Sequence, residues 1–298
     1  MANILYDAID VSKHQGTVNW DNVKNTGISH VMIRAGYGRY SSQKDPQFER
    51  NVRECEKRGI HWGAYWYSYA TSTTQAQQEA NVFLSIMRGK KPDMPLAYDI
   101  EYEPGILALS DSTRTQMVKA FLNKVEAAGY YGMLYASKDF IQNYLNYNEL
   151  KAYDVWCAQY GSSCTCPLPY GIWQYSSKNA LGIPGYGNSL DCNHVYKDYP
   201  TIIKNAGLNG WGKPNEDDGD KNIATNMQLI TIGPITGVDV ITIKNLCVSL
   251  QLVSQGLYKE SNGTLTIGPV SSGDAYLIMK KCEDLDLVSR GYYKSKYV

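Results

Sequence analysis

Long apolar runs and an excess of charge of either sign are both missing from this 298-residue chain. No stretch reaches the roughly 18 apolar residues that a membrane-spanning helix needs, so we expect no membrane partner. Lys and Arg number 29, and so do Asp and Glu, which leaves no net charge to attract nucleic acid. The start, MANILYDAID, lacks the basic and apolar segments of a signal peptide. We expect either synthesis in the cytosol or a leader that has been removed.

The cysteines do not indicate a disulfide framework, because there are 7 of them, an odd number in a long chain. Cys164 and Cys166 form the one closely spaced pair, and no His or Cys cluster follows to complete a zinc site. Cys55 falls on the apolar face of a predicted helix with Phe48 and Val52, as a buried thiol would. The sequence therefore predicts no metal site and no cofactor.

Phenylalanine is also scarce, with 4 residues, whereas there are 25 tyrosines. A tyrosine combines a flat apolar ring with a hydroxyl group. Sugars present C–H faces and hydroxyl rims together, so this composition suits a glycan-binding protein. An ordinary tyrosine-rich core and surface would have the same composition, and the count alone does not separate the two.

Eight short runs of β-branched, aromatic and small apolar residues predict strands. They lie at residues 4–12, 30–38, 61–70, 95–102, 131–137, 153–161, 170–177 and 189–196. Most are apolar nearly throughout, which is typical of parallel strands that are covered on both faces. Helical patterns separate the earlier runs, at about 45–59, 74–87 and 112–129. After the sixth run the segment GSSCTCPLP is too short for a crossover helix, so we expect an α/β fold, an irregular (β/α) TIM-like barrel.

The composition of the sequence changes near Ala206. Residues 206–225 are rich in Gly, Asn and Asp without periodicity and read as a linker between a barrel domain at 1–205 and a second domain at 226–298. The second domain contains an internal repeat, with copies that start near Thr231 and Thr266. Of the 29 aligned positions, 14 are identical, which indicates a duplicated unit.

Each copy of the repeat reads as strand, helix, strand, and Asn262-Gly263 between the copies is a hairpin signal. The domain is therefore predicted to be a small α+β domain with β-α-β-β-α-β order, a ferredoxin-like topology. Its two helices are expected to bury Ile243, Leu246, Leu250, Ile278 and Leu285. Cys247 and Cys282 occupy equivalent positions and are expected to be buried thiols.

The segment MPLAYDIEYE places two carboxylates in an apolar run, where ionised groups are costly. Asp99 and Glu101 are two residues apart, so in a strand they share one face. Two neighbouring carboxyl groups divide the proton between them, and glycosidases need one protonated acid and one anion. Glu103 is expected to lie beyond the strand on a solvated loop.

Two further acids are predicted to lie at the same mouth of the barrel. The first strand ends in AIDVS and the eighth contains LDCN, so Asp10 and Asp191 are expected at the C-terminal ends of neighbouring strands. Taken singly, each acid could be a strand-end residue or a helix cap. Because all four recur at strand ends, we predict that Asp10, Asp99, Glu101 and Asp191 surround one cavity.

The first 200 or so residues resemble glycoside hydrolase family 25, the lysozymes of phages, bacteria and some fungi. The resemblance is carried by IDVSKHQG, YDIE, YAS, VWCAQYG, IWQYSS and DCN, in the order and spacing of the family. It implies an N-acetylmuramidase that cleaves the β-1,4 bond between N-acetylmuramic acid and N-acetylglucosamine in peptidoglycan. It also implies that Glu101 is the acid, and that Asp99 supports an intermediate formed by the substrate's own N-acetyl group. Asp10 and Asp191 complete the implied site.

Aromatic and amide side chains near the strand ends are candidates for binding sugar, although core packing would explain each of them equally well. These substrate-binding candidates are Tyr65, Tyr67, Tyr135, Trp156, Trp173, Gln159 and Gln174. His14 follows the first strand and is given no catalytic role.

The C-terminal repeat resembles the SPOR domain, a peptidoglycan-binding module with two β-α-β halves. This implies a tether to the cell wall, with Tyr258 and Tyr293 as candidate binding residues. A dimerisation domain or a plain structural domain is the alternative, and the sequence leaves the oligomeric state open.

The two resemblances together suggest a phage endolysin that is made in the host cytoplasm and acts on the bacterial cell wall. One alternative is a non-catalytic glycan-binding protein on the same barrel, although the intact Asp99 and Glu101 argue against it. Another is a chitinase or N-acetylglucosaminidase on a similar barrel.

Overall fold

The computed structural model describes residues 3–212, 228–249, 252–253, 256–270, 278–279 and 281–297. Contacts divide the chain into two compact units, one formed by residues 1–126 and 130–215 and the other by residues 127–129 and 216–298. Among the described residues, no helix combines the length and the apolar character needed to cross a bilayer.

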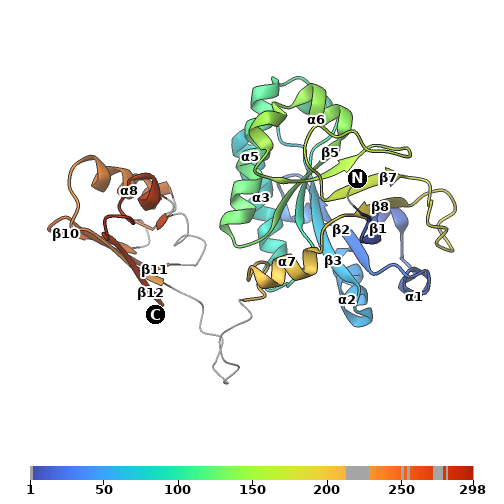
Figure 1. The fold of residues 1–298 in the computed structure, drawn as a ribbon, viewed down its shortest axis with the longest axis horizontal. Helices are drawn as coiled ribbons and strands as arrows, with labels where there is room; N and C mark the ends of the chain where they lie inside the picture. The colour runs from blue at the N-terminus through green and yellow to red at the C-terminus, as the bar shows by residue number, and fades with distance from the viewer. Residues whose placement is uncertain are drawn as a thin grey trace. The chain divides into compact units, whose positions relative to one another are not determined.

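The first unit is a closed barrel of eight strands in sequence order, with helices packed around its outside (Figure 1). Its strands are β1 (Tyr6–Val11), β2 (His30–Tyr37), β3 (His61–Tyr67), β4 (Leu96–Asp99), β5 (Gly132–Ser137), β6 (Asp154–Ala158), β7 (Ile172–Ser176) and β8 (Asp191–Val195). The α-helices are α1 (Trp20–Asn25), α2 (Phe48–Arg58), α3 (Thr73–Met87), α4 (Pro104–Leu107), α5 (Asp111–Ala127), α6 (Lys138–Tyr144) and α7 (Tyr199–Asn205). Short 3₁₀ turns are η1 (Lys13–Gln15), η2 (Ser41–Gln43) and η3 (Tyr147–Leu150). The predicted irregular barrel is confirmed.

Strands β1 to β7 run parallel, whereas β8 is antiparallel to both of its neighbours, β7 and β1. The segment between β7 and β8 contains no helix, and an antiparallel neighbour needs no crossover helix. The prediction that Asp191 ends its strand is therefore wrong, because Asp191 is the first residue of β8. The reversed direction of β8 still places Asp191 opposite Asp10 of β1.

Side chains alternate between the barrel interior and the layer under the helices, as the period of a strand requires. In β4, Ala97 packs inside the barrel, whereas Leu96 and Tyr98 belong to the outer core beneath the helices. In β6, Trp156 is an interior residue and Cys157 an outer one. This alternation decides which side chains reach the mouth of the barrel.

The barrel unit extends past the predicted boundary at residue 205. The buried side chain of Asn209 accepts a hydrogen bond from the Tyr131 backbone N–H at 2.7 Å and donates to the carbonyl groups of Pro92 and Met94. The Trp211 indole donates to the Pro92 carbonyl at 3.0 Å. The first part of the predicted linker is thus packed against the barrel.

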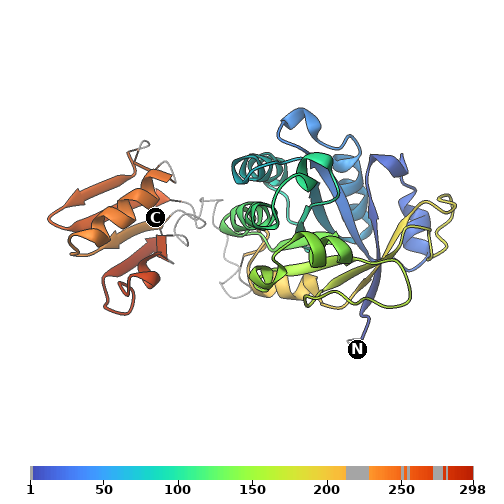
Figure 2. The ribbon, with the colours of Figure 1, turned by 90° about the horizontal axis from the view of Figure 1, so that it is seen from above.

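The second unit is a four-stranded antiparallel sheet in the order β10-β11-β9-β12. Its described elements are β9 (Gln228–Ile232), α8 (Val238–Ser249), β10 (Tyr258–Ser261), β11 (Thr264–Val270) and β12 (Tyr293–Tyr297). Helix α8 lies on one face of this sheet (Figure 2). The strand order is that of the predicted ferredoxin-like topology.

The duplicated helical segments contribute to one core in the second unit. Ile243, Ile278, Cys247 and Cys282 are fully buried, and Leu246 and Leu285 pack against them in partly buried positions. Both cysteines are buried thiols that are not joined in a disulfide, as predicted. Leu250 lies outside the described residues.

Candidate active site

The four predicted acids meet at one cavity of about 270 Å³ at the mouth of the barrel. Asp10 comes from β1, Asp99 from the end of β4 and Asp191 from the start of β8, while Glu101 follows β4 by two residues. The same cavity is lined by Ser12, His14, Gln15, Arg34, Tyr65, Tyr67, Tyr135, Trp156, Tyr160 and Gln174. The parallel strands explain this meeting, because their C-terminal ends share one end of the barrel.

Asp10 is held by two side-chain amides in a buried position. Its Oδ2 accepts hydrogen bonds from Gln174 Nε2 at 3.0 Å and from Asn193 Nδ2 at 2.9 Å. Burial raises the pKa of Asp10 to about 8, and the nearby Asp191 and Glu101 carboxylates raise it as well, while the two amide bonds oppose the shift. Asp10 is therefore a carboxyl group that holds its proton near neutral pH.

The orientation of the Asn193 amide is fixed by a group that can only donate, and a tyrosine hydroxyl contacts the Gln174 amide. The Trp156 indole N–H can only donate, and it donates to Asn193 Oδ1 at 2.7 Å, which leaves Nδ2 for Asp10. The Tyr135 hydroxyl donates to Gln174 Oε1 at 3.0 Å. A continuous chain of hydrogen bonds thus joins the rings of Tyr135 and Trp156 to the Asp10 carboxyl group.

Asp99 and Glu101 form a coupled pair of carboxyl groups. Burial raises the pKa of both, most strongly for Asp99, which is only 3% exposed. A hydrogen bond between the two carboxyl groups raises the pKa of Asp99 further and lowers that of Glu101. In the free protein these directions favour the proton on Asp99, and the two adjacent carboxyl groups together can supply one proton and one anion.

Asp191 completes the ring of acids. It is half-buried, and burial raises its pKa to about 6. Its proximity raises the pKa values of Asp10 and Glu101 in turn. Four close carboxyl groups therefore cannot all be ionised near neutral pH, and the site retains protons.

Glu103 lies beyond β4, as predicted, but it is not the solvated residue that was expected. It is the residue before α4 and is half-buried, and its Oε1 accepts a hydrogen bond from the Tyr67 hydroxyl at 2.6 Å. Tyr67 is thereby fixed at the cavity wall.

Two of the predicted sugar-binding residues do not line this cavity. Trp173 lies on the opposite face of β7 from Gln174, and its indole donates to the Gln159 carbonyl at 2.7 Å. The Gln159 side chain accepts from the Thr165 backbone N–H at 2.8 Å. Both residues organise the segment between β6 and β7.

Asn193, Arg34 and Tyr160 are among the residues at the site that were not predicted. Asn193 lies two residues after Asp191 on the same face of β8, so the strand period alone could have identified it. Arg34 of β2 lowers the pKa of Asp99, and its Nε donates to Asp45 Oδ2 at 2.8 Å. The Tyr160 hydroxyl donates to Gln174 Oε1 at 3.2 Å from beyond the end of β6.

The interaction of Cys157 with Cys164 and Cys166 raises the pKa of the Cys157 thiol and lowers the pKa values of the other two, a proximity that sequence spacing did not indicate. Over the parts of the chain that the structure describes, no group of three or more His, Cys, Asp or Glu side chains is arranged to hold a metal ion.

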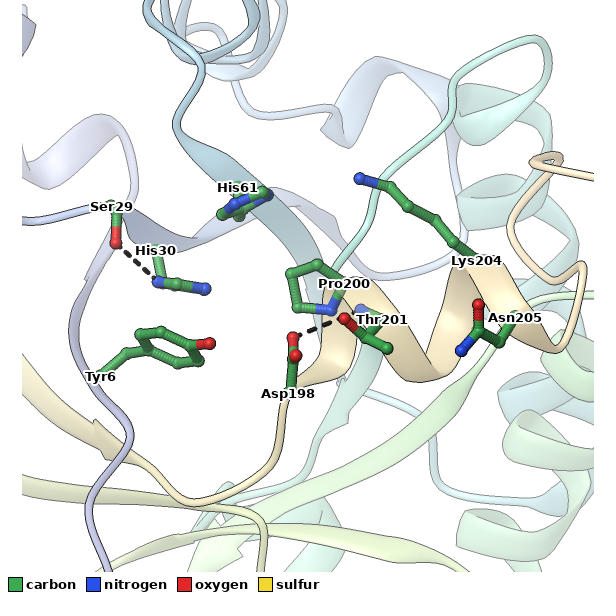
Figure 3. A pocket seen from close by; sticks show the side chains of 9 residues that line it. All are labelled: Tyr6, Ser29, His30, His61, Asp198, Pro200, Thr201, Lys204 and Asn205. Atoms are coloured by element: carbon green, nitrogen blue, oxygen red, sulfur yellow. Dashed lines mark hydrogen bonds between the residues drawn. The ribbon is translucent and has the colours of Figure 1, made fainter. Parts of the chain in front are cut away.

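A separate cavity of about 480 Å³ lies at the N-terminal ends of β1, β2 and β3, beside α7 (Figure 3). The rings of Tyr6 and His30 stack there with centroids 4.1 Å apart, and His61 lies beyond them. Burial and the neighbouring His61 lower the pKa of His30 to about 4. None of the four acids lines this cavity, so it belongs to the opposite end of the barrel.

Tyr258 and Tyr293 of the second unit do not share a surface. Tyr258 begins β10 and Tyr293 begins β12, which are the two edge strands of the sheet. Both rings pack partly against the core of that unit. The two candidate binding residues therefore lie on two separate edges of the sheet.

Two curated proteins are similar in sequence to this chain. Lysozyme M1 of Streptomyces globisporus is 29% identical over 201 residues, which cover 62% of this chain and 66% of the relative. The autolytic lysozyme of Clostridium acetobutylicum is 25% identical over 224 residues, which cover 74% of this chain and 64% of the relative. The chain thus spans a little under two thirds of the length of these curated relatives.

A solved structure is also similar to this chain in fold. The crystal structure of the CTP1L endolysin has a TM-score of 0.58 and 27% identity, over 67% of this chain and 70% of that chain. The family model described as glycosyl hydrolases family 25 matches residues 9–183, a range that includes Asp10, Asp99 and Glu101. Since this match covers more than half of the sequence, the chain belongs to glycosyl hydrolase family 25.

Proposed function

We propose that the barrel unit is a lysozyme-type peptidoglycan hydrolase, an N-acetylmuramidase that cleaves the β-1,4 bond between N-acetylmuramic acid and N-acetylglucosamine. The observation that carries this proposal is the meeting of Asp10, Asp99, Glu101 and Asp191 at one cavity at the barrel mouth. Membership of family 25 and the lysozyme relatives support it.

Glu101 acts as the general acid in this proposal. A proton donor must reach the oxygen of the leaving sugar, and Glu101 is the more exposed member of the pair. The proposal requires the proton that the pair shares to lie on Glu101 when substrate is bound. Glu101 becomes an anion as it protonates the leaving oxygen, and Asp99 is the carboxylate beside the positive charge that develops on the sugar. Asp99 Oδ1 is buried and accepts no hydrogen bond from the protein, so it is available to the N–H of a substrate N-acetyl group.

Asp99 therefore supports an intermediate that forms when the N-acetyl oxygen of the substrate attacks its own anomeric carbon. Water then opens this intermediate, and Glu101 takes back a proton from that water. The configuration at the anomeric carbon is retained without a protein nucleophile, which is an exception to the scheme with two protein carboxylates. Asp10 and Asp191 help to position the sugar and to keep the site protonated.

The bond specificity is tested by digesting purified peptidoglycan, reducing the new ends with borohydride and identifying them by mass spectrometry. Muramitol ends are expected. Glucosaminitol ends would instead assign the chain to the N-acetylglucosaminidases, and an absence of new ends would favour a non-catalytic glycan-binding protein.

We further propose that the second unit is a SPOR-like cell-wall-binding module, and that the whole protein acts as an endolysin on bacterial peptidoglycan from the host cytoplasm. The duplicated sequence, the strand order of the sheet and the likeness to the CTP1L endolysin support this role. Expression inside a susceptible host is its test. Lysis that requires a co-expressed membrane pore supports the role, and lysis without any pore contradicts it.

A further inference from the structure

A third cavity, of about 820 Å³, lies on the outer side of β7 and β8, where aromatic rings gather. Tyr175 of β7 and His194 of β8 are stacked, with ring centroids 4.0 Å apart and planes inclined by 10°. Trp173 meets both of them edge-on, and Tyr170 and Tyr196 form a further pair with centroids 5.5 Å apart. The wall of the cavity is therefore built largely of ring faces and ring edges.

This cavity is distinct from the catalytic one, because the two use opposite faces of the same strands. Gln174 of β7 and Asn193 of β8 face inward and bind Asp10. Their sequence neighbours Trp173, Tyr175 and His194 face outward and line the aromatic cavity. None of the four acids lines it.

The lining has the chemistry of an uncharged sugar site. Among the described residues, no Lys, Arg, Asp or Glu lines the cavity. The polar groups are tyrosine hydroxyls, serine hydroxyls, an asparagine, the Cys164 thiol and the His194 imidazole, whose Nδ1 lies 2.8 Å from Asp7 Oδ1. Such groups donate and accept hydrogen bonds around flat apolar rings. Such a lining disfavours phosphate-rich or strongly acidic ligands and suits the C–H faces and hydroxyl rims of N-acetylated sugars. The volume is within the usual range for small-ligand sites, about 300–1,000 Å³.

The aromatic cavity is also adjacent to the catalytic cavity along the chain. Tyr160 lines the catalytic cavity, and the next residue, Gly161, lines the aromatic one. The Gly161 backbone N–H donates to the Tyr175 carbonyl at 3.1 Å, which ties this junction to β7.

We propose that the aromatic cavity of the barrel is an auxiliary binding site for uncharged N-acetylated glycan, separate from the catalytic cavity. The inference rests on the proposed function, since the glycan it holds is a further stretch of the polymer that the barrel hydrolyses. Binding there raises the local concentration of substrate at the acids without taking part in catalysis.

The NMR signals of two tryptophan indole N–H groups report separately on the two cavities. The indole N–H of Trp156 lies at the catalytic cavity and that of Trp173 at the aromatic cavity, and each is hydrogen-bonded within the protein. The experiment titrates the full-length Glu101→Gln protein, labelled with ¹⁵N, with the trisaccharide of N-acetylglucosamine. Trp156→Phe and Trp173→Phe variants assign the two signals.

The Trp173 signal is expected to shift and saturate with its own dissociation constant. In the Tyr170→Ala/Tyr196→Ala variant this constant is expected to rise at least about tenfold, because two ring contacts are lost. The Trp156 signal should respond as before in that variant, which also shows that the barrel is folded. Tyr170→Ala alone serves if the double variant does not fold, and Tyr40→Ala, at a tyrosine that is 63% exposed on another loop, is the matched control.

A Trp173 signal that stays fixed while Trp156 saturates would overturn the inference and leave the proposed function standing. So would a Trp173 response that is unchanged in the tyrosine variants. A silent Trp156 together with a responsive Trp173 would count against the proposed function and not against the auxiliary site.

Discussion

Asp10 and Asp191 are direct partners across the antiparallel strands β1 and β8. The two carboxyl groups would repel each other if both were ionised, and burial strengthens that repulsion. The family 25 barrel thus contains a second acidic pair beside Asp99 and Glu101. The site therefore retains protons because the barrel buries these carboxyl groups close together.

The first prediction concerns stability and pH. The pKa of Asp10 is about 8 in the folded protein and 3.8 in an ordinary setting. A group with a raised folded pKa stabilises the protein fully below its unfolded pKa, and this contribution is lost as the pH rises through its folded pKa. The free energy of unfolding of the wild-type protein should therefore fall between about pH 4 and pH 8 through this residue.

Urea unfolding of the wild type and of Asp10→Asn at several pH values measures this effect. The variant cannot ionise at position 10, so its stability should fall less over the same range. Parallel curves for the two proteins would show that Asp10 titrates normally.

The second prediction concerns the end of the barrel unit. Asn209→Ala should lower the free energy of unfolding by at least about 1–3 kcal/mol, because it leaves buried backbone groups of Tyr131, Pro92 and Met94 without their partner. A fragment ending at residue 212 should accordingly be more stable than one ending at residue 205. Thermal unfolding followed by near-UV circular dichroism measures both, and equal midpoints for the two fragments would contradict the role of Asn209.

The third prediction concerns the second unit. A fusion of residues 226–298 to a green fluorescent protein should fold and decorate susceptible cells. Since Tyr258 and Tyr293 lie on opposite edges of the sheet, Tyr258→Ala and Tyr293→Ala should each weaken binding partly and independently. A tail that stays off the walls and forms tight dimers in sedimentation experiments would favour the dimerisation alternative.

The sequence predicted much of the site because its signals are local. The two-residue period of a strand correctly placed Asp99 inside the barrel, and Asp10 ends up at the same mouth. The direction of β8 was not predictable in this way, since an apolar run looks the same for a parallel and an antiparallel strand. Asp191 lies at the site because β8 runs antiparallel to its neighbours, a direction that the residues of β8 do not themselves indicate.

Other differences come from contacts between distant segments. Both faces of β7 carry large side chains, so the pattern did not tell that Gln174 faces inward and Trp173 outward. The bond from Tyr67 to Glu103 and the contact of Cys157 with Cys164 depend on how loops fold over strand ends. Such contacts require the tertiary structure.

The fourth prediction concerns the anion of the catalytic pair. Asp99→Asn should lower kcat on soluble wall fragments by about a hundredfold or more, because the uncharged amide cannot stabilise the positive charge of the intermediate. The barrel should stay folded, since the amide has the same shape as the carboxyl group. Asp21→Asn makes the same chemical change at an exposed position of α1 that does not line the catalytic cavity, and it should leave kcat unaltered. Equal rates for the Asp99→Asn and wild-type proteins would remove Asp99 from the mechanism.

The most direct test of the whole account is the Glu101→Gln protein, assayed for release of new reducing ends from soluble peptidoglycan fragments. The amide keeps the shape of the side chain but has no proton to give, and general acid catalysis contributes about 10²–10⁴-fold. Glu56→Gln makes the same chemical change at an exposed position of α2 and serves as the control. We predict that Glu101→Gln is folded and loses at least about 10²-fold in rate while Glu56→Gln matches the wild type; a folded Glu101→Gln protein with the wild-type rate would contradict the central claim.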